Sequence, residues 1–214
     1  GGMGIVYKAY HPDLKRIVAL KVLMARNQAS ATSKKRFLQE IKTLVLLEHP
    51  GIIQILDSGE ENGELYYVME YVDGKPFREK EACSLREKVA FIQKTLEALS
   101  YVHQQGVIHR DIKLDNIFRT NTGAPKLGDF GLAKELQLEQ ESSEKLTQSG
   151  VLLGTPQYMA PEQARESSKE IDARSDLYAL GVCLYKLITE KYPHEAGTLH
   201  QLFDKILSEE PKIP

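Results

Sequence analysis

A short polar segment at residues 109–116, His-Arg-Asp-Ile-Lys-Leu-Asp-Asn, carries the residue types best suited to chemistry in this chain. It holds a carboxylate at Asp111, an ammonium at Lys113 and an amide at Asn116, and a second carboxylate follows at Asp129 within Asp-Phe-Gly. Carboxylate and amide oxygens are ligands that Mg²⁺ accepts, usually together with substrate phosphates. A carboxylate beside a cation can also accept a hydroxyl proton while the cation holds a transferring phosphoryl group. Asp and Asn form turns readily, so either motif alone would be weak evidence.

Together the two motifs resemble the catalytic loop and the metal-binding loop of eukaryotic-type serine/threonine protein kinases. Residues 154–162, Gly-Thr-Pro-Gln-Tyr-Met-Ala-Pro-Glu, are similar to the substrate-docking segment of the bacterial branch of that family. The resemblance implies that Asp111 orients the acceptor hydroxyl and accepts its proton, while Lys113 balances charge on the γ-phosphoryl group of ATP. Asn116 and Asp129 would hold Mg²⁺, or Mn²⁺ in its place, and Thr155 would hydrogen-bond to the catalytic loop.

The first residues of the chain predict a β-hairpin, with strands over 5–10 and 16–22 and a His-Pro-Asp turn between them. Glycines before the first strand would let backbone N–H groups approach phosphate oxygens, although a plain turn explains a glycine cluster equally well. Residues 18–21, Val-Ala-Leu-Lys, are similar to the kinase strand whose lysine pairs with nucleotide phosphates. Of the family's G-x-G-x-x-G loop this segment keeps only the part from Gly1 to Gly4, so we expect a weakened lid over the nucleotide.

Residues 33–48 predict a helix, because an apolar stripe recurs there at helical spacing. The stripe consists of Phe37, Ile41, Leu44 and Leu47. A glutamate at the edge of such a stripe, as at position 40, would ordinarily be a solvated charge. The resemblance implies instead that Glu40 pairs with Lys21 and aligns the lysine on the α- and β-phosphates of ATP.

Two more strands are predicted over 52–58 and 64–71, with an Asn-Gly hairpin turn at 62–63. Residues 68–74 resemble the kinase hinge, where the backbone of Glu70 and Val72 would hydrogen-bond to adenine and Met69 would border the pocket behind it. The other residues assigned to the nucleotide pocket by resemblance are Gly1, Gly4, Val6, Ala19 and Phe118. The aromatic ring of Phe118 would narrow the pocket floor, where the family usually has an aliphatic residue.

From residue 75 onward the pattern is mainly helical. A capping box at 84–87, Ser-Leu-Arg-Glu, starts an amphipathic helix that we expect to end near Gly106. Short strands are predicted over 117–118 and 125–128. A helix over 174–190 is apolar on most sides and is predicted to be buried, and a shorter helix follows over 199–206.

Two acidic residues in this part need partners. Burying Asp176 would be costly unless its charge is compensated. The positive end of its helix is one explanation, and the resemblance offers another, in which Asp176 accepts backbone N–H groups of the catalytic loop. The last helices of the family, with the arginine that pairs with Glu162, are absent from these residues. We therefore expect Glu162 to lack a partner and an apolar face to be uncovered.

Residues 135–150 form the most polar stretch, with too few apolar residues to order itself by burial. A solvated loop without a function is one interpretation. By its position between Asp-Phe-Gly and Ala-Pro-Glu the stretch resembles the activation segment, in which a phosphate would pair with Arg110 and order the loop. Thr147 and Ser149 are the candidate sites of autophosphorylation.

The composition excludes several classes of protein. The chain is 42% hydrophobic and 27% charged, as expected of a globular protein, and its net charge of −2 gives no electrostatic footprint for nucleic acid or an acidic membrane. Two cysteines provide no disulfide framework, and no apolar run is long enough to span a bilayer. We expect a cytoplasmic segment without membrane contact of its own, which leaves room for an anchor elsewhere in a parent protein.

We therefore expect an α+β, protein-kinase-like bilobal fold over residues 1–214. It would comprise a small β-rich N-lobe with one main helix over 1–69, a hinge over 70–74 and a larger, mainly helical C-lobe over 75–214. The expected activity is transfer of the ATP γ-phosphoryl group to Ser/Thr hydroxyls of proteins in signal transduction. A nucleotide-binding pseudokinase or scaffold, or an inactive fragment, is the main alternative, although pseudokinases generally lose a catalytic residue that is present here. Kinases of small molecules lack the docking segment at 154–162.

Overall fold

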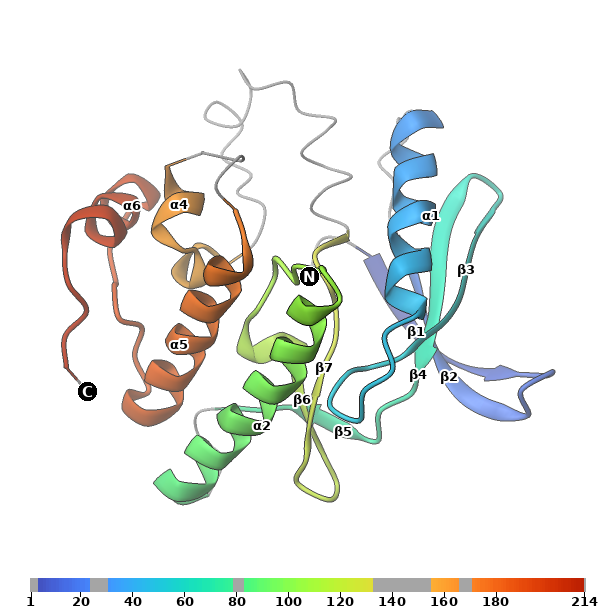
Figure 1. Cartoon of the computed structure of the whole chain (residues 1–214), viewed down its shortest axis with the longest axis horizontal. Coiled ribbons are helices and arrows are strands. Elements are labelled where there is room, and N and C mark those ends of the chain that lie inside the picture. Colours follow the sequence, from blue (N-terminus) through green and yellow to red (C-terminus); the bar gives the residue numbers. More distant parts are fainter. Residues whose placement is uncertain (1–3, 24–30, 79–82, 133–154, 166–170, 214) are drawn as a thin grey trace. The chain divides into compact units, whose positions relative to one another are not determined.

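The computed structural model describes residues 4–23, 31–78, 83–132, 155–165 and 171–213 (Figure 1). Its elements, with η denoting a 3₁₀ helix, are β1 (Gly4–His11), β2 (Arg16–Leu23), α1 (Ala31–Val45), β3 (Ile55–Glu61), β4 (Glu64–Glu70), β5 (Gly74–Pro76), α2 (Leu85–Gln104), η1 (Leu114–Asn116), β6 (Ile117–Thr120), β7 (Pro125–Leu127), η2 (Pro156–Tyr158), α4 (Pro161–Ala164), α5 (Ala173–Thr189) and α6 (Leu199–Ser208). The chain divides into two compact units. The first is Gly1–Asp73 with Gly131–Leu153, and the second is Gly74–Phe130 with Gly154–Pro214. The described part is α+β, as predicted.

The first unit contains an antiparallel sheet with strand order β1-β2-β4-β3. The predicted hairpin at the start of the chain is confirmed, with β1 and β2 paired from Gly4↔Leu23 to His11↔Arg16. The predicted turn between β3 and β4 is also confirmed. Asn62 and Gly63 have φ of 51° and 83°, the left-handed values that Asn-Gly hairpin turns require.

Helix α1 packs against the sheet of the first unit, and Figure 1 shows it running beside β3. The predicted stripe is buried, since Phe37, Ile41 and Leu44 are 2%, 0% and 3% exposed. Near the start of the helix, the Lys34 ammonium lies 2.6 Å from a carboxylate oxygen of Glu60 in β3. The helix ends at Val45, three residues before its predicted end at 48. The apolar stripe of α1 therefore packs into the core of this unit.

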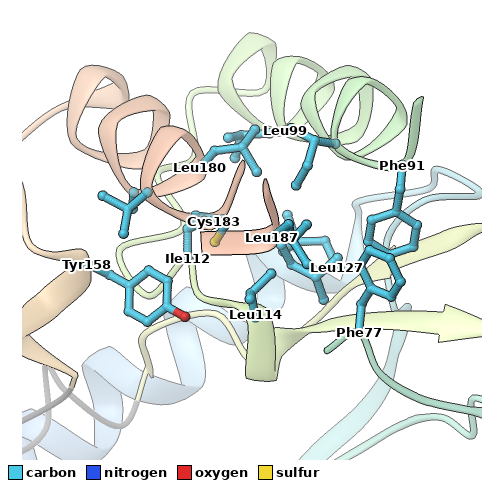
Figure 2. Packing of buried hydrophobic residues seen from close by; sticks show 14 residues of the cluster. Phe77, Phe91, Leu99, Ile112, Leu114, Leu127, Tyr158, Leu180, Cys183 and Leu187 are labelled. Carbon is cyan, nitrogen blue, oxygen red and sulfur yellow. The ribbon is translucent and has the colours of Figure 1, made fainter. Parts of the chain in front are cut away.

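The second unit is built around α2 and α5, which pack side by side. The capping box of α2 is confirmed, because Ser84 Oγ accepts the Glu87 N–H and Glu87 accepts the Ser84 N–H. Figure 2 shows the core that these helices share with the catalytic loop and the small sheet. In the part of the chain that the structure describes, no helix is long and apolar enough to cross a bilayer.

Strand β5 was not predicted, and it completes a small antiparallel sheet of order β5-β6-β7. Gly74-Lys75-Pro76 is a poor strand sequence, since glycine and proline both disfavour strands. Gly74 is required there, because a Cβ atom at this position would collide with the carbonyl oxygen of Arg119 in β6. The strand is therefore set by backbone approach rather than by side-chain pattern.

Helix α5 is less buried than its apolar sequence indicated. Leu180, Cys183 and Leu187 are at most 4% exposed, but Leu177 is 45% exposed. The prediction of a buried helix is therefore wrong at Leu177. This residue lies on a narrow exposed strip with Arg174 and Gly181, whereas the other positions of α5 are buried or half-buried.

Candidate active site

The catalytic-loop segment connects α2 to β6 and is anchored by its apolar residues. Ile112 and Leu114 are 3% and 2% exposed and insert into the core of the second unit (Figure 2). The residues that alternate with them keep some access to solvent, since the side chains of Asp111 and Lys113 are 11% and 18% exposed. The apolar positions thus fix the loop, while the polar positions remain accessible for chemistry.

The carboxylate of Asp111 is held by two donors. The Lys113 ammonium lies 2.9 Å from Asp111 Oδ2, and the Asn116 amide nitrogen lies 3.0 Å from the same oxygen. The amide nitrogen also donates to the Asp111 carbonyl oxygen at 2.8 Å. Charge-assisted hydrogen bonds of this kind are stronger than those between neutral groups, and they orient the carboxylate. The structure therefore brings the three predicted catalytic-loop residues together.

The two predicted metal ligands also lie close together. The Asn116 amide nitrogen is 3.3 Å from the Asp129 carbonyl oxygen. With its nitrogen turned toward these acceptors, the Asn116 amide presents its oxygen on the opposite side. One amide oxygen and one carboxylate suit Mg²⁺, which takes few protein ligands. Asp129 has φ of 56°, a conformation that is uncommon for a residue other than glycine and is often found at functional sites.

Asp176 fixes the backbone of the catalytic loop from the first turn of α5. It is 2% exposed, and its carboxylate accepts the backbone N–H groups of His109 and Arg110, each at 2.8 Å. The role implied by the family resemblance is confirmed. The position in the first helical turn adds the favourable helix dipole, so both explanations hold. Arg110 has φ of 64°, and Asp176 stabilises the loop in this uncommon conformation.

His103 is a further member of this network that the sequence did not reveal. Its Nε2 lies 2.8 Å from Asp176 Oδ2, and because an ionised carboxylate can only accept, the ring nitrogen donates. His103 lies in the last turn of α2, where a histidine would ordinarily be solvated. The contact joins residues that are far apart in the chain, and no local pattern predicts it.

His109 is fully buried beneath the loop and is held as a neutral ring. Its Nε2 lies 3.1 Å from the Gly128 carbonyl oxygen, and its Nδ1 accepts the Asp111 N–H at 3.3 Å. The ring stacks on Phe130 with centroids 4.4 Å apart. Burial lowers the pKa of His109, against the opposing effect of the Asp176 and Asp111 charges. A proton on Nε2 satisfies both hydrogen bonds, whereas a second proton would leave Nδ1 unable to accept.

We expect the free energy of unfolding to fall as the pH decreases below about 6.5, the unfolded-state pKa of histidine. Because the folded-state pKa of His109 is lowered, the unfolded chain binds the additional proton first. At pH of about 5.5 this linkage amounts to at most about 1.4 kcal/mol. Urea unfolding of the protein and of its His109→Phe variant, at pH values of about 6.5 and about 5.5, measures the effect.

The variant should lose part of the pH dependence. Burial also lowers the pKa of His194, so this histidine should add to the pH dependence of stability with the same sign as His109. The His194→Gln variant measures that second contribution. An identical dependence in the protein and in His109→Phe would show that His109 does not carry it.

Four residues predicted to line the nucleotide pocket share one face of the first sheet. Val6 lies opposite Lys21, and Ala19 lies opposite Met69. Residues opposite each other in antiparallel strands point to the same face, and so do residues two apart in one strand, such as Ala19 and Lys21. The Lys21 ammonium lies 5.8 Å from the centroid of the Tyr67 ring on that face. The strand register therefore groups these residues as the resemblance requires.

Gly4 has a structural role in the same ladder. A Cβ atom at Gly4 would lie 2.5 Å from the carbonyl oxygen of Val22 in β2. Gly1 lies outside the described residues, as do Gly154, Thr147 and Ser149. The glycine at position 4 is therefore required by strand pairing, whether or not it also approaches a phosphate.

The other residues assigned to the nucleotide pocket by resemblance belong to several elements. Glu40 is half-buried in α1, and Val72 follows β4. The Glu70 N–H donates to the Gln54 carbonyl oxygen at 2.9 Å, so a contact with adenine at Glu70 would have to use its carbonyl. Phe118 belongs to β6 in the second unit, opposite Pro76 and Lys126.

The described part of the predicted docking segment begins with Thr155, which precedes η2. Tyr158 is 6% exposed and packs edge-on against Tyr192, with ring centroids 5.5 Å apart. Figure 2 shows its phenol oxygen directed toward Leu114, and both residues belong to the buried core of the second unit. Burial raises the pKa of Tyr158 and keeps the phenol neutral. Tyr158 thus attaches the docking segment to the catalytic loop, while the hydrogen bond expected at Thr155 stays a prediction.

Residues 1–213 match the family model described as the protein kinase domain. The chain belongs to this family. Serine/threonine-protein kinase pkn3 from Myxococcus xanthus is 40% identical over 223 residues, which cover 100% of this chain and 40% of that protein. Serine/threonine-protein kinase PknB from Mycolicibacterium smegmatis is 39% identical over 201 residues, covering 90% and 31%. Serine/threonine-protein kinase PknA from Mycobacterium tuberculosis is 38% identical over 224 residues, covering 100% and 50%.

This kinase chain spans about a third to a half of the length of these curated relatives. All three are bacterial, as the resemblance implied. ATP and a divalent cation are used generally in the family, and protein substrates and autophosphorylation are general to it as well.

One expectation about this kinase domain is wrong. Glu162 does not lack a partner, because the Ser175 hydroxyl donates to Glu162 Oε1 at 2.5 Å. The partner is a hydroxyl group on the buried first turn of α5 and not an arginine from a later helix. Ser175, like His103, was missed because its partner lies in a segment that the local sequence does not connect to it.

Proposed function

We propose that this kinase domain transfers the γ-phosphoryl group of ATP to Ser and Thr hydroxyls of proteins, as part of a signalling protein. The observation that carries the proposal is the Asp111 carboxylate, held at 2.9 Å by the Lys113 ammonium and at 3.0 Å by the Asn116 amide. A carboxylate oriented in this way can accept the proton of an acceptor hydroxyl. The names of the relatives, all serine/threonine-protein kinases, support the same activity.

Asp111 orients the acceptor hydroxyl and takes its proton, and Lys113 offsets negative charge on the phosphoryl group. Asn116 and Asp129 supply the oxygen ligands for Mg²⁺, and Mn²⁺ would suit the same oxygens. When bound, the cation neutralises charge on the nucleotide phosphates. Thr155 would help to hold the acceptor beside Asp111. Phosphoryl transfer asks little covalent chemistry of the protein, so positioning and charge are the main contributions of these residues.

On the first unit, Lys21 binds the α- and β-phosphates and Glu40 pairs with Lys21. This proposal is supported by the strand register, which groups Lys21 with Val6, Ala19 and Met69 on one face of the sheet. Glu70 and Val72 contribute backbone groups to adenine, and Gly1 and Gly4 border the phosphates. In this proposal Asp111 acts on the acceptor hydroxyl and Lys21 binds the nucleotide.

We expect Lys21→Met to lower turnover by at least about a hundredfold, because it removes a preorganised charge from the phosphates. The measurement is transfer of labelled phosphate from ATP to dephosphorylated casein, with Mg²⁺ and nucleotide titrated separately. Lys8→Met is the matched control, since Lys8 is one row away on the same sheet face, with its ammonium 4.4 Å from the centroid of the Tyr71 ring. The control should keep turnover within about twofold of the unmodified protein.

The outcomes of this experiment separate an active protein kinase from a pseudokinase. Nucleotide binding without transfer by the unmodified protein would favour a pseudokinase, and normal turnover in Lys21→Met would overturn the assignment of the lysine. The same assay without casein measures autophosphorylation, for which Thr147 and Ser149 are our candidates. Replacing both hydroxyl residues should lower activity if a phosphate on one of them orders the activation segment.

A further inference from the structure

The first turn of α5 holds two functional segments through adjacent residues. Asp176 binds the backbone N–H groups of the catalytic loop. Ser175, one position earlier, donates its hydroxyl proton to Glu162 of the docking segment. Both residues are 2% exposed, so the two contacts are made in a protected environment.

A buried serine is an unfavourable choice for the start of a helix unless its hydroxyl is used. Alanine has the higher helix propensity, and burying an unsatisfied hydroxyl is costly. Ser175 is not needed as the cap, because Asp172 is the N-cap and accepts the Arg174 N–H at 2.8 Å. The contact with Glu162 is therefore the physical reason for a hydroxyl at position 175.

Glu162 lies in α4, which is too short to be stable alone. A helix of four residues forms little of its own hydrogen bonding, so contacts with other elements must stabilise it. Two such contacts are present on different sides. Ala164 packs against Leu202 and Ile206 of α6, and the Glu162 carboxylate is held by Ser175.

The docking segment is thereby anchored at two points. Tyr158, in the middle of the segment, is buried in the core of the second unit together with Leu114, and Glu162, its last residue, accepts the Ser175 hydroxyl proton in α5. A hydrogen bond to a charged group contributes more than one between neutral groups. Losing the second anchor would release the end of the segment without touching Asp111, Lys113 or Asn116.

We propose that Ser175 is a positioning residue for the protein substrate, because it fixes Glu162 and with it the docking segment. The inference rests on the proposed kinase function and adds to it a residue that acts on acceptor binding. Ser175 contacts neither nucleotide nor acceptor in this role. Its effect should therefore appear in the efficiency toward the protein acceptor and leave the KM for ATP unchanged.

The test uses the full-length protein with dephosphorylated casein as the acceptor. Ser175→Ala should lower kcat/KM for casein about tenfold, as expected for the loss of one hydrogen bond to a charged group, with the KM for ATP within about twofold. Ser175→Thr keeps a hydroxyl donor and should recover most of the loss. Ser84→Ala is the matched control, since Ser84 Oγ also donates to a glutamate, at 2.7 Å from Glu87, outside the docking segment.

A double-mutant cycle with Glu162→Ala separates positioning from folding. If the contact carries the effect, Ser175→Ala should cause no further loss of kcat/KM in the Glu162→Ala background. Equal effects of Ser175→Ala on both substrates, or additive effects of the two substitutions, would overturn the proposal. Absence of phosphate transfer by the unmodified protein would instead refute the kinase function itself.

Discussion

Asp111→Asn is expected to lower kcat by about 10²–10⁴-fold, the usual contribution of a general base, while the fold is retained. The amide has nearly the shape of the carboxylate but cannot accept the hydroxyl proton. It also loses the charge that faces Lys113, whose ammonium lies 2.9 Å away. Single-turnover phosphate transfer with saturating ATP and casein measures the chemical step, and thermal unfolding monitors the fold.

Asp115→Asn provides a control in the same loop. The Asp115 carboxylate pairs with Arg78 at 2.5 Å, and both side chains are about half exposed, at 49% and 53%. Exposed ion pairs contribute little to stability, so this variant should keep kcat within a few-fold of the unmodified protein. If Asp111→Asn turned over at a normal rate, or if both variants failed equally, Asp111 could not be the base.

Asp176→Asn is expected to lower the free energy of unfolding by about 2–4 kcal/mol and to remove most of the activity. Three donors converge on this buried carboxylate, namely the N–H groups of His109 and Arg110 and the ring nitrogen of His103. An asparagine offers one acceptor oxygen and turns an NH₂ group toward a donor. Urea unfolding measures the stability, and phosphate transfer measures the consequence for the catalytic loop.

The same substitution at Asp172, at the start of the same helix, is the matched control. Asp172 is an exposed N-cap that accepts the Arg174 N–H, and asparagine caps helices about as well as aspartate. Asp172→Asn should therefore change stability and activity little. A comparable loss of stability in the two variants would mean that Asp176 acts as an ordinary helix-end charge.

Much of the local structure could be predicted because it is encoded over short distances. Alternation and turn residues predict the hairpins of the first sheet, and a capping box predicts the start of α2 at Leu85. Motif spacing also identified the loop in which Lys113 and Asn116 bind Asp111, because these residues lie within five positions of one another.

The contacts that the sequence did not reveal join distant segments. His103 meets Asp176 across 73 positions, and Ser175 meets Glu162 across 13, through side chains that any exposed helix could also carry. Strand β5 is set by a close backbone approach at Gly74, which leaves no side-chain pattern. The exposure of Leu177 likewise depends on which side of α5 packs on the core, and an apolar sequence does not specify that side.

The close approach of β1 to Val22 makes the glycine at position 4 a requirement of the fold. Because the chain at Gly4 has no room for a Cβ atom, any side chain there would disturb the β1–β2 ladder before a nucleotide is involved. A related protein that no longer binds ATP would still need this glycine for the pairing of β1 with β2. Its retention in a relative therefore reports an intact hairpin, and it should carry no weight in deciding which members of a lineage remain enzymes.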